Sequence, residues 1–371
     1  MNFTDFVEDG FVINQQRSDI NDLAVLSLRI SIKSYFSTYN VMKYTFSGLR
    51  NEIEPNYFSE YYECYCDAIV HFQHFVELAI KQVLRNEHEL LALNANDKPV
   101  LLYKLLKQEP LTDNDYEKLH SIEFSESLKR LQALIKEGKI ADSNLRVYIT
   151  YADVLSRLNN LRNRIWHRGA FIVRYKALDQ LFIRYLLPLA IDIISHPNYS
   201  NVQKFWMYPS LKCGIDPIKE LIIEGESNGY NICKVALLKE LGRASYSNPI
   251  IQVPGFEDLA DSDKKKFEGR AKSEKLNGDV DDVCKCPVCG CDTLVVYKEV
   301  EEQFLGVPDT QEEICTGMIE YTWQAVCTCC SFEITNDLGN PSDYGMTKIR
   351  DLWYERISLQ IRLLNALKRI S

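Results

Sequence analysis

Two short cysteine motifs constrain the fold of this chain more than any other feature of its sequence. Each motif, Cys286-Pro-Val-Cys289-Gly and Cys327-Thr-Cys-Cys330, places two thiols in one tight turn, and strand-like runs at 293–297 and 320–326 lie between them. Two such turns at the ends of hairpins supply four thiolates to a tetrahedral zinc ion. We therefore predict a small β zinc ribbon at 284–345 with an insertion around 300–315, ligated by Cys286, Cys289, Cys327 and Cys330.

Three further cysteines leave the choice of ligands open. Cys284, Cys291 and Cys329 lie in the same two groups, so any of them could replace a ligand, and a second metal ion is also possible. We expect a structural zinc, because a small domain buries too little apolar surface to fold alone. A catalytic zinc site often uses histidine, and no histidine follows His196. Clustered thiols with this spacing favour metal binding in a reducing compartment over disulfides.

The rest of the sequence has the composition of a globular protein with a sizeable core. Hydrophobic residues make up 46% and charged residues 26%, and the net charge is −9, so a polyanion would need a local basic patch. The first ten residues lack the basic and apolar regions of a secretory signal. The most apolar stretch, 178–194, is too short and too polar to span a membrane. We therefore expect a cytoplasmic protein that does not enter the membrane.

Apolar spacing predicts a mainly α-helical protein. Helical patterns cover 19–39, 57–85, 125–138, 143–167 and 176–195, whereas 88–120 is interrupted by turn-forming residues and is expected to be rich in loops. The stretch 257–283 is nearly devoid of apolar residues and could be a solvated helix or a flexible tether. The expected organisation is a helical lead-in (1–55), a helical domain with an extension (56–245), a charged linker (246–283), the zinc ribbon (284–345) and an amphipathic C-terminal helix (346–371).

A concentrated basic segment lies at the end of the helix predicted at 143–167. Residues 154–177 contain no acidic residue, and they carry the six cations Arg157, Arg162, Arg164, Arg168, Arg174 and Lys176. His167 lies among these cations, just before Gly169, where the helix is expected to end. Histidine can exchange a proton near neutral pH, and arginine binds a phosphate through its planar fork. The combination suits cleavage of a phosphodiester.

Helix geometry argues that Arg162 and His167 of one chain do not converge on one phosphate. Positions five apart lie roughly 140° around a helix and about 7.5 Å along it. Two copies related by a two-fold axis could each supply an arginine and a histidine to a shared cleft. We therefore expect a homodimer formed through this helix.

The segment LNNLRNRIWHRG closely resembles the signature of HEPN domains. In that signature an arginine is followed by a polar residue, then a few residues and a histidine, often with a glycine soon after; here these are Arg162, Asn163, His167 and Gly169. The stretches HFQHFVELAIKQVLR, SESLKRLQALI and ALDQLFIRYLLPLAIDII resemble the neighbouring helices of the family, so that the resemblance extends over about 57–197. It implies a small helical bundle, dimerisation through the signature helices and metal-independent cleavage of RNA. In that reaction the 2′-hydroxyl of the substrate attacks the phosphate and leaves 2′,3′-cyclic phosphate and 5′-hydroxyl ends.

The resemblance also implies roles for individual residues. His167 is then the general acid or base, Arg162 holds the phosphate, and Asn163 orients His167 or the substrate. Some members carry an acidic residue on the first helix that joins the site. Glu77 could take that part, or could instead pair with Lys81 one helical turn away.

Other residues near the signature have two readings each. The side chains of Arg157, Arg164 and Arg168 would contact the RNA backbone or simply keep the surface soluble. Trp166 could stack on a base, although packing in the core or in a dimer is the more ordinary role. His71 and His74 on the first long helix have no evident third ligand, so they are read as ordinary helical histidines.

Three functions follow from these observations. The first is an RNA endonuclease that acts as a toxin or effector in prokaryotic antiviral defence. The second is a catalytically inactive HEPN-like module that binds nucleotides or RNA or serves as a scaffold. The third is a regulator that binds nucleic acid through the ribbon, but 284–345 contains Lys285 and Lys298 against eleven acidic residues. That balance favours a protein partner or regulator at the ribbon.

Overall fold

The computed structural model describes residues 17–52, 56–94, 98–112, 115, 118–168, 171–200, 202–227, 229–250, 257–306 and 313–359. These residues belong to two compact units, and each unit combines two separate stretches of the chain. The first unit takes its residues from 1–35 and 62–207, and the second from 36–61 and 208–371. Residues 36–61 and 208–245, which the sequence placed in the lead-in and the helical extension, therefore belong to the same unit as the cysteine motifs.

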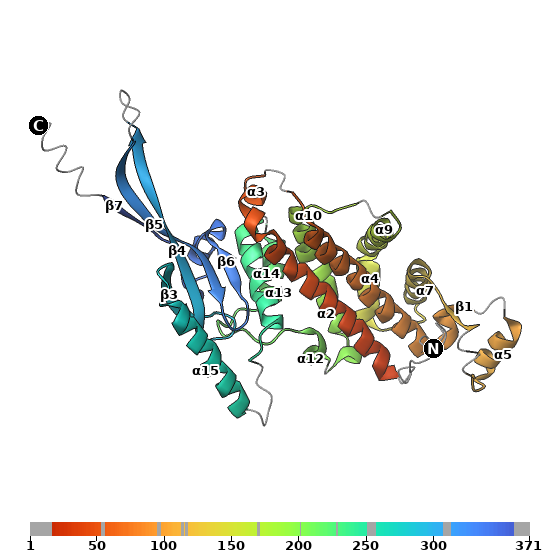
Figure 1. Cartoon of the computed structure of the whole chain (residues 1–371). Coiled ribbons are helices and arrows are strands. Elements are labelled where there is room, and N and C mark those ends of the chain that lie inside the picture. The colour runs from red at the N-terminus through yellow and green to blue at the C-terminus, as the bar shows by residue number, and fades with distance from the viewer. Residues whose placement is uncertain are drawn as a thin grey trace, which may run out of the picture. The chain divides into compact units, whose positions relative to one another are not determined.

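The first unit is helical, as the apolar spacing predicted. Its longer helices are α2 (Arg17–Met42, which runs on past residue 35), α4 (Ser59–Glu87), α7 (Phe124–Lys136) and α9 (Ala152–Arg168), shown in Figure 1. Ile69, Phe72, Val76 and Ile80 recur at three- and four-residue spacing along α4, and all four are fully buried. An apolar stripe of this period is buried in the unit's core, as expected of an amphipathic helix.

Aromatic rings from three segments meet in this core. The ring of Tyr35 stacks on Phe182 with 4.1 Å between centroids, and Phe72 meets Phe182 edge-on at 6.1 Å. Such pairs contribute about 0.5–1.5 kcal/mol each beyond their buried area. Phe182 begins a π-helical turn (Phe182–Leu186) that joins α10 (Tyr175–Leu181) to α11 (Leu187–Ile194). The helix predicted at 176–195 is thus present, with a wide turn before Pro188, which has no N–H to donate.

The stretch that the sequence predicted to be rich in loops contains a nine-residue helix. Helix α5 (Pro99–Lys107) begins at a proline, because the first turn of a helix needs no N–H from that residue. Strands β1 (Leu93–Asn94) and β2 (His120–Ser121) form a short antiparallel pair. Helix α7 ends where the sequence placed its end, since Gly138 follows with a left-handed φ of +66°. Further short helices of the unit lie at Glu89–Leu91, Ser143–Arg146, Val147–Thr150, Pro197–Tyr199 and Gln203–Trp206.

The second unit contains a curled antiparallel sheet. Its strands are β3 (Val280–Lys285), β4 (Asp292–Gly306), β5 (Glu313–Cys327), β6 (Glu333–Thr335) and β7 (Glu355–Leu359). They pair in the order β3-β4-β5-β6, and β7 pairs with the far half of β5. Figure 1 shows β4 and β5 running together well past β3 and β6. The extra residues around 300–315 therefore extend a hairpin, and 307–312 lie outside the described residues.

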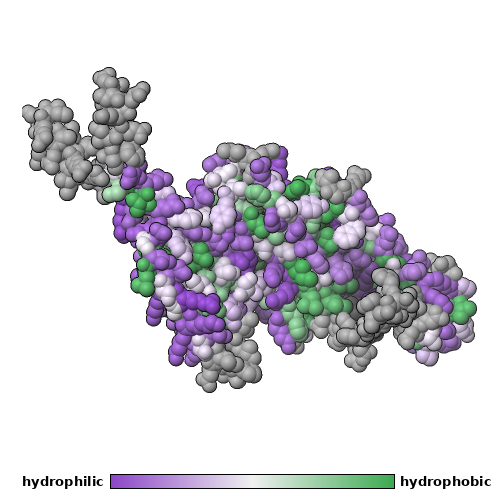
Figure 2. All heavy atoms as spheres, in the orientation of Figure 1, coloured by the Kyte–Doolittle hydropathy of each residue, from purple (hydrophilic) through white to green (hydrophobic). Residues whose placement is uncertain are grey.

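Part of the expected charged linker is a helix that packs on the sheet. Helix α15 (Glu257–Glu274) places Phe267, Glu268 and Ala271 on one face, and Ala271 is buried against Val280 of β3 and Val295 of β4. The rest of its described surface is polar, and Figure 2 shows a mainly hydrophilic face over this helix. A single small buried contact explains why the stretch looked like a tether in sequence.

The prediction of a C-terminal helix at 346–371 is wrong for the described residues. Residues 346–354 form turns, and Glu355–Leu359 forms β7. Met346, Ile349 and Leu352 are buried. Their three-residue spacing resembles that of a helix face, but their side chains enter the core from an irregular segment. The Oδ1 atom of Asn340 accepts the N–H groups of Leu352 and Trp353 and holds these turns in place. Residues 360–371 lie outside the described residues.

Three further α-helices lie wholly in the described part of the second unit. They are α13 (Pro217–Glu226) and α14 (Ile232–Tyr246), together with the short α3 (Phe46–Arg50). Helix α14 is buried on nearly every side, and its Gly242 leaves no room for a side chain beside the ring of Phe36. The buried carboxylate of Glu240 binds Arg243 at 2.6 Å and accepts the N–H of Glu333 at 2.7 Å. These bonds attach α14 to the start of β6.

Across the described residues, no helix is both long enough and apolar enough to span a membrane.

Candidate functional site

The four predicted cysteine ligands come together in the second unit. Cys286 and Cys289 lie in the turn between β3 and β4, and Cys327 and Cys330 lie at the end of β5 and in the turn that follows. Their four sulfur atoms lie within 4.8 Å of one another, and all four residues are at most 4 % exposed. The cluster agrees with the ligand set predicted from sequence.

The distances between the sulfur atoms fit a bound metal ion. The Sγ atoms of Cys286 and Cys330 are 3.6 Å apart, and those of Cys289 and Cys327 are 3.8 Å apart. A tetrahedral ion with metal–sulfur bonds of about 2.3 Å would hold its sulfurs about 3.8 Å apart. A disulfide needs a separation of about 2.05 Å. The arrangement is therefore compatible with a structural metal.

Nearby polar groups prepare the cluster for charged thiolates. The backbone N–H groups of Cys329 and Cys330 both point to the Sγ atom of Cys327 at 3.4 Å. The Oγ1 atom of Thr293 lies 3.1 Å from the same sulfur and 3.6 Å from that of Cys289. Hydrogen bonds to ligand atoms orient them and stabilise their negative charge. The cluster thus has the polar support expected around a metal centre.

Of the three cysteines that left the ligand set open, two adjoin the cluster. The Sγ atoms of Cys291 and Cys329 lie within 4.8 Å of Cys289 and of each other. Cys284 belongs to neither group among the described residues, and burial raises the pKa of its thiol. Cys291 and Cys329 therefore remain possible ligands by position, whereas Cys284 does not.

The first cysteine turn is attached to the loop that precedes α13. The N–H of Lys212 donates to the carbonyl oxygen of Val288 at 3.1 Å, and the N–H of Cys213 donates to that of Pro287 at 2.9 Å. Gly290 has a φ of +75°, and a Cβ atom there would lie 2.7 Å from Cγ of Lys212. The glycine after Cys289 thus serves both the turn and the close approach of this loop.

Helix α9 carries the predicted phosphate-binding and acid–base residues. Leu155, Leu158 and Ile165 are buried along one face, and Arg162 occupies the same face between the last two. The Nη1 atom of Arg162 donates to Oδ1 of Asn163 at 3.1 Å. Its Nε atom is buried and has no hydrogen-bond partner among the described residues. An arginine thus stands where a leucine would continue the apolar stripe.

The positive charge of Arg162 acts on His74 of α4. The pKa of His74 is lowered mainly by burial of its ring, and the positive charges of Lys81 and Arg162 lower it further. Glu77 acts in the opposite direction on the same histidine. The Nδ1 atom of His74 is 2.9 Å from the hydroxyl of Ser27 on α2. Sequence reasoning set His74 aside, although its three-residue spacing from Glu77 was a visible signal that the two share a helix face.

Glu77 pairs within its own helix. Its carboxylate binds Nζ of Lys81 at 2.5 Å and Nε2 of Gln73 at 3.0 Å. This contact is the alternative that the sequence left open for Glu77. The negative charge of Glu77 and the positive charge of Arg162 both act on the pKa of His74.

His167 lies near the exposed C-terminal end of α9. Its side chain is exposed, and so is the neighbouring Trp166, at 66 %. Arg162 is partly buried on the inward face of α9, roughly 140° around the helix from His167. No hydrogen bond or ion pair joins Arg162 to His167 among the described residues, and the guanidinium carbon of Arg162 lies 5.6 Å from the ring centroid of Trp166. Trp166 is also not a core residue of its own chain.

The remaining cations of α9 face the solvent where they are described. Arg157 and Arg164 are exposed, and the guanidinium carbon of Arg164 lies 3.6 Å from the ring centroid of Phe171. Arg168 is the last residue of α9, and its side chain and Gly169 lie outside the described residues. The exposed arginines leave a positive surface at this end of the helix.

No model of a known protein family, no curated protein and no solved structure matches this chain.

Removal of one cysteine ligand should remove the metal and unfold the ribbon. In the Cys286→Ser protein, we expect the metal content to fall by one equivalent per chain, measured by elemental mass spectrometry. Metal binding supplies about 10–16 kcal/mol to the folding of small zinc domains, so thermal unfolding should begin at a much lower temperature. The matched control is Cys284→Ser, which should keep its metal. Equal metal content in both variants would contradict the ligand assignment.

Replacement of Arg162 by leucine should not destabilise the protein. The change extends the apolar face of α9 and removes a buried Nε atom that lacks a partner, so the free energy of unfolding should stay constant or rise by about 1 kcal/mol. Urea denaturation measures it. Leu158→Ala, on the same face, should cost about 2–5 kcal/mol. A loss above about 2 kcal/mol for Arg162→Leu would instead make Arg162 a structural residue.

Proposed function

We propose that this protein is a metal-independent RNA endonuclease of the HEPN kind, which acts as a homodimer. The placement of Arg162 carries the proposal. This arginine occupies an inward position of α9 that suits an apolar residue, and its Nε atom is unsatisfied. A cation retained at such a position has a role other than stability.

The exposed end of α9 supports the same proposal. The segment 154–177 has six cations and no acidic residue, in a chain of net charge −9. His167 and Trp166 are both exposed there. A histidine free to reach a substrate and a large exposed aromatic side chain suit a surface that meets a second copy and an RNA strand.

The reaction follows from these groups. His167 of one copy takes the proton of the 2′-hydroxyl, whose oxygen attacks the adjacent phosphorus atom. The bond from phosphorus to the 5′-oxygen breaks, and the leaving oxygen receives a proton from a protonated His167 of the other copy. Arg162 and the exposed arginines stabilise the negative charge on the non-bridging oxygens, while Asn163 holds Arg162 through its side-chain oxygen. The products carry 2′,3′-cyclic phosphate and 5′-hydroxyl ends.

We also propose an identity for the metal ion and a biological role for the protein. The ion held by Cys286, Cys289, Cys327 and Cys330 is zinc, in a structural role outside the reaction. The resemblance to HEPN domains suggests a toxin or effector of prokaryotic antiviral defence that acts in the cytoplasm.

The second candidate is an inactive HEPN-like module that binds nucleotides or RNA or serves as a scaffold. One observation favours it. The carboxylate of Glu77 is occupied by Lys81 and Gln73, and so is not free to assist a reaction in this conformation.

Loss of His167 should abolish cleavage. We expect His167→Ala to cut RNA at least about 100-fold more slowly than the wild type, because a general acid–base group contributes about 10²–10⁴-fold. Both proteins are incubated with RNA in a chelator, their bound metal is measured afterwards, and the product ends are analysed. The control is His120→Ala, an exposed histidine on β2. Equal rates for wild type and His167→Ala would refute the assignment, and absence of any cleavage would favour the inactive module.

Dimerisation and cleavage should fail together. Trp166→Glu places a charge on the exposed end of α9, and burial of an uncompensated charge in an interface costs several kcal/mol. We expect this variant to sediment as a monomer and to lose cleavage. The control is Tyr103→Glu, at an exposed aromatic residue of α5. A Trp166→Glu protein that stays dimeric, or a monomer that cleaves at the wild-type rate, would contradict the shared cleft.

A further inference from the structure

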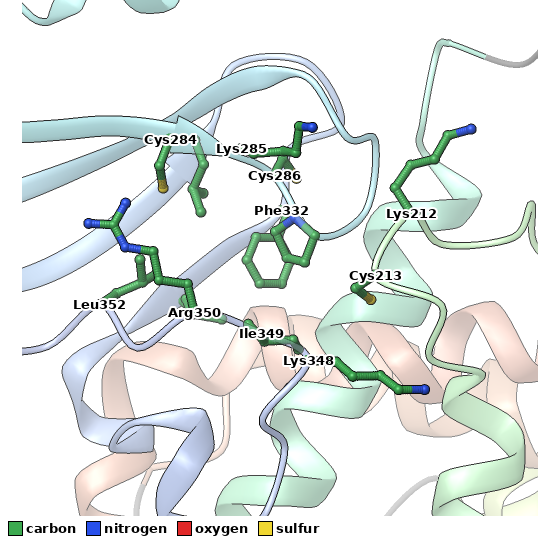
Figure 3. A pocket seen from close by; sticks show the side chains of 13 residues that line it. Lys212, Cys213, Cys284, Lys285, Cys286, Phe332, Lys348, Ile349, Arg350 and Leu352 are labelled. Atoms are coloured by element: carbon green, nitrogen blue, oxygen red, sulfur yellow. The ribbon is translucent and has the colours of Figure 1, made fainter.

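A pocket of about 270 Å³ opens beside the first cysteine turn (Figure 3). Five segments of the second unit line it: the loop at 212–213 before α13, the end of β3 with the turn at 284–287, Leu294 of β4, the stretch at 332–334 and the turns at 348–352. Buried apolar side chains line its interior, among them Phe332, Ile349 and Leu352. The pocket therefore offers an apolar surface that a flat organic group could cover.

Four cations surround this apolar surface. They are Lys212, Lys285, Lys348 and Arg350, and all four are exposed. None of the residues that line the pocket is acidic. In a ribbon with eleven acidic residues at 284–345, this is an unusual concentration of one charge. It attracts anions to the mouth of the pocket.

Acidic partners neutralise little of this positive charge. Arg350 lies 3.1 Å from a carboxylate oxygen of Asp282, and Lys348 donates to the carbonyl oxygen of Gly214 at 3.4 Å. No ion pair engages Lys212 or Lys285 among the described residues. The stem of Lys212 lies against Gly290, so its position depends on the cysteine turn. Three of the four cations are thus available to an anionic ligand.

The chemistry of the pocket selects a ligand with an apolar, flat part and a multiply charged anionic part. Ligand sites commonly enclose about 300–1,000 Å³, so this pocket suits a small molecule or one residue of a longer chain. Several cations at one rim suit a phosphate, which carries more than one negative charge, better than a single carboxylate. An arginine at the edge can also stack on a nucleobase. A nucleotide meets these requirements.

We propose that this pocket binds a nucleotide, with the base against the apolar lining beside Arg350 and the phosphate between Lys212 and Lys348, which lie on the other side of Phe332 (Figure 3). The nucleotide is either free in solution or one residue of an RNA strand. This inference does not depend on cleavage by α9, because the pocket lies wholly in the second unit.

Binding is measured by calorimetry on the full-length, metal-loaded His167→Ala protein, which keeps RNA intact if the wild type cleaves it. The probes are AMP, ribose 5-phosphate, inorganic phosphate and a five-residue RNA. We expect AMP to bind with a Kd below about 1 mM, and to bind at least about tenfold more tightly than either probe that lacks a base. Similar affinities for AMP and the RNA identify a free nucleotide as the ligand, and much tighter binding of the RNA that Lys212→Gln and Lys348→Gln also weaken identifies a strand.

Two substitutions test the pocket itself. Lys212→Gln and Lys348→Gln should each weaken AMP binding by about tenfold, since a hydrogen bond to a charged group contributes about 1.5–3 kcal/mol. Both lysines are exposed, so the variants should fold, and their metal content verifies this. The control is Lys298→Gln on β4, where the lysine pairs with Glu320 away from the pocket. Absence of saturable binding, equal affinity for AMP and inorganic phosphate, or binding that neither pocket substitution weakens would overturn the proposal.

Discussion

The approach of four thiols to one point is the constraint on which the ribbon unit depends. The two cysteine turns lie at the same end of the antiparallel β4–β5 pair, where Leu294 pairs with Cys327. There Cys286 faces Cys330 and Cys289 faces Cys327. The same turn that carries Cys286 and Cys289 receives the N–H groups of the loop before α13. A bound metal would therefore fix the sheet and, through this loop, the position of Lys212 at the pocket.

Helix α9 separates two tasks on two of its faces. Arg162 is partly buried, with its guanidinium carbon 5.6 Å from the ring centroid of Trp166, while His167 faces the solvent. A helix cannot turn both side chains to one point without leaving its regular geometry. In the proposed dimer, a second copy would avoid that distortion, because symmetry would let the exposed residues of one helix complete the surroundings of the other.

Local sequence patterns predicted the elements whose packing is local. The cysteine turns, the buried face of α4 and the end of α7 at Gly138 each depend on residues a few positions apart. Patterns that depend on distant partners were misread. Met346, Ile349 and Leu352 have a helical spacing but are buried in turns, since the sheet and Asn340 supply their partners. The cations of the pocket were missed because Lys212, Lys348 and Arg350 lie outside the stretch whose charges indicate the character of the ribbon.

Each unit is built from two separate stretches of the chain. This affects how the chain folds during synthesis and how it can be divided into fragments. Phe36 packs against Gly242, and Lys43 pairs with Glu333, so the ribbon unit needs residues from near both ends of the chain. During synthesis, residues 36–61 can pack against their partners only after most of the chain has been made. No single cut in the chain yields two intact halves. A fragment that starts after residue 61 would keep every cysteine motif yet lack a wall of the core around α14.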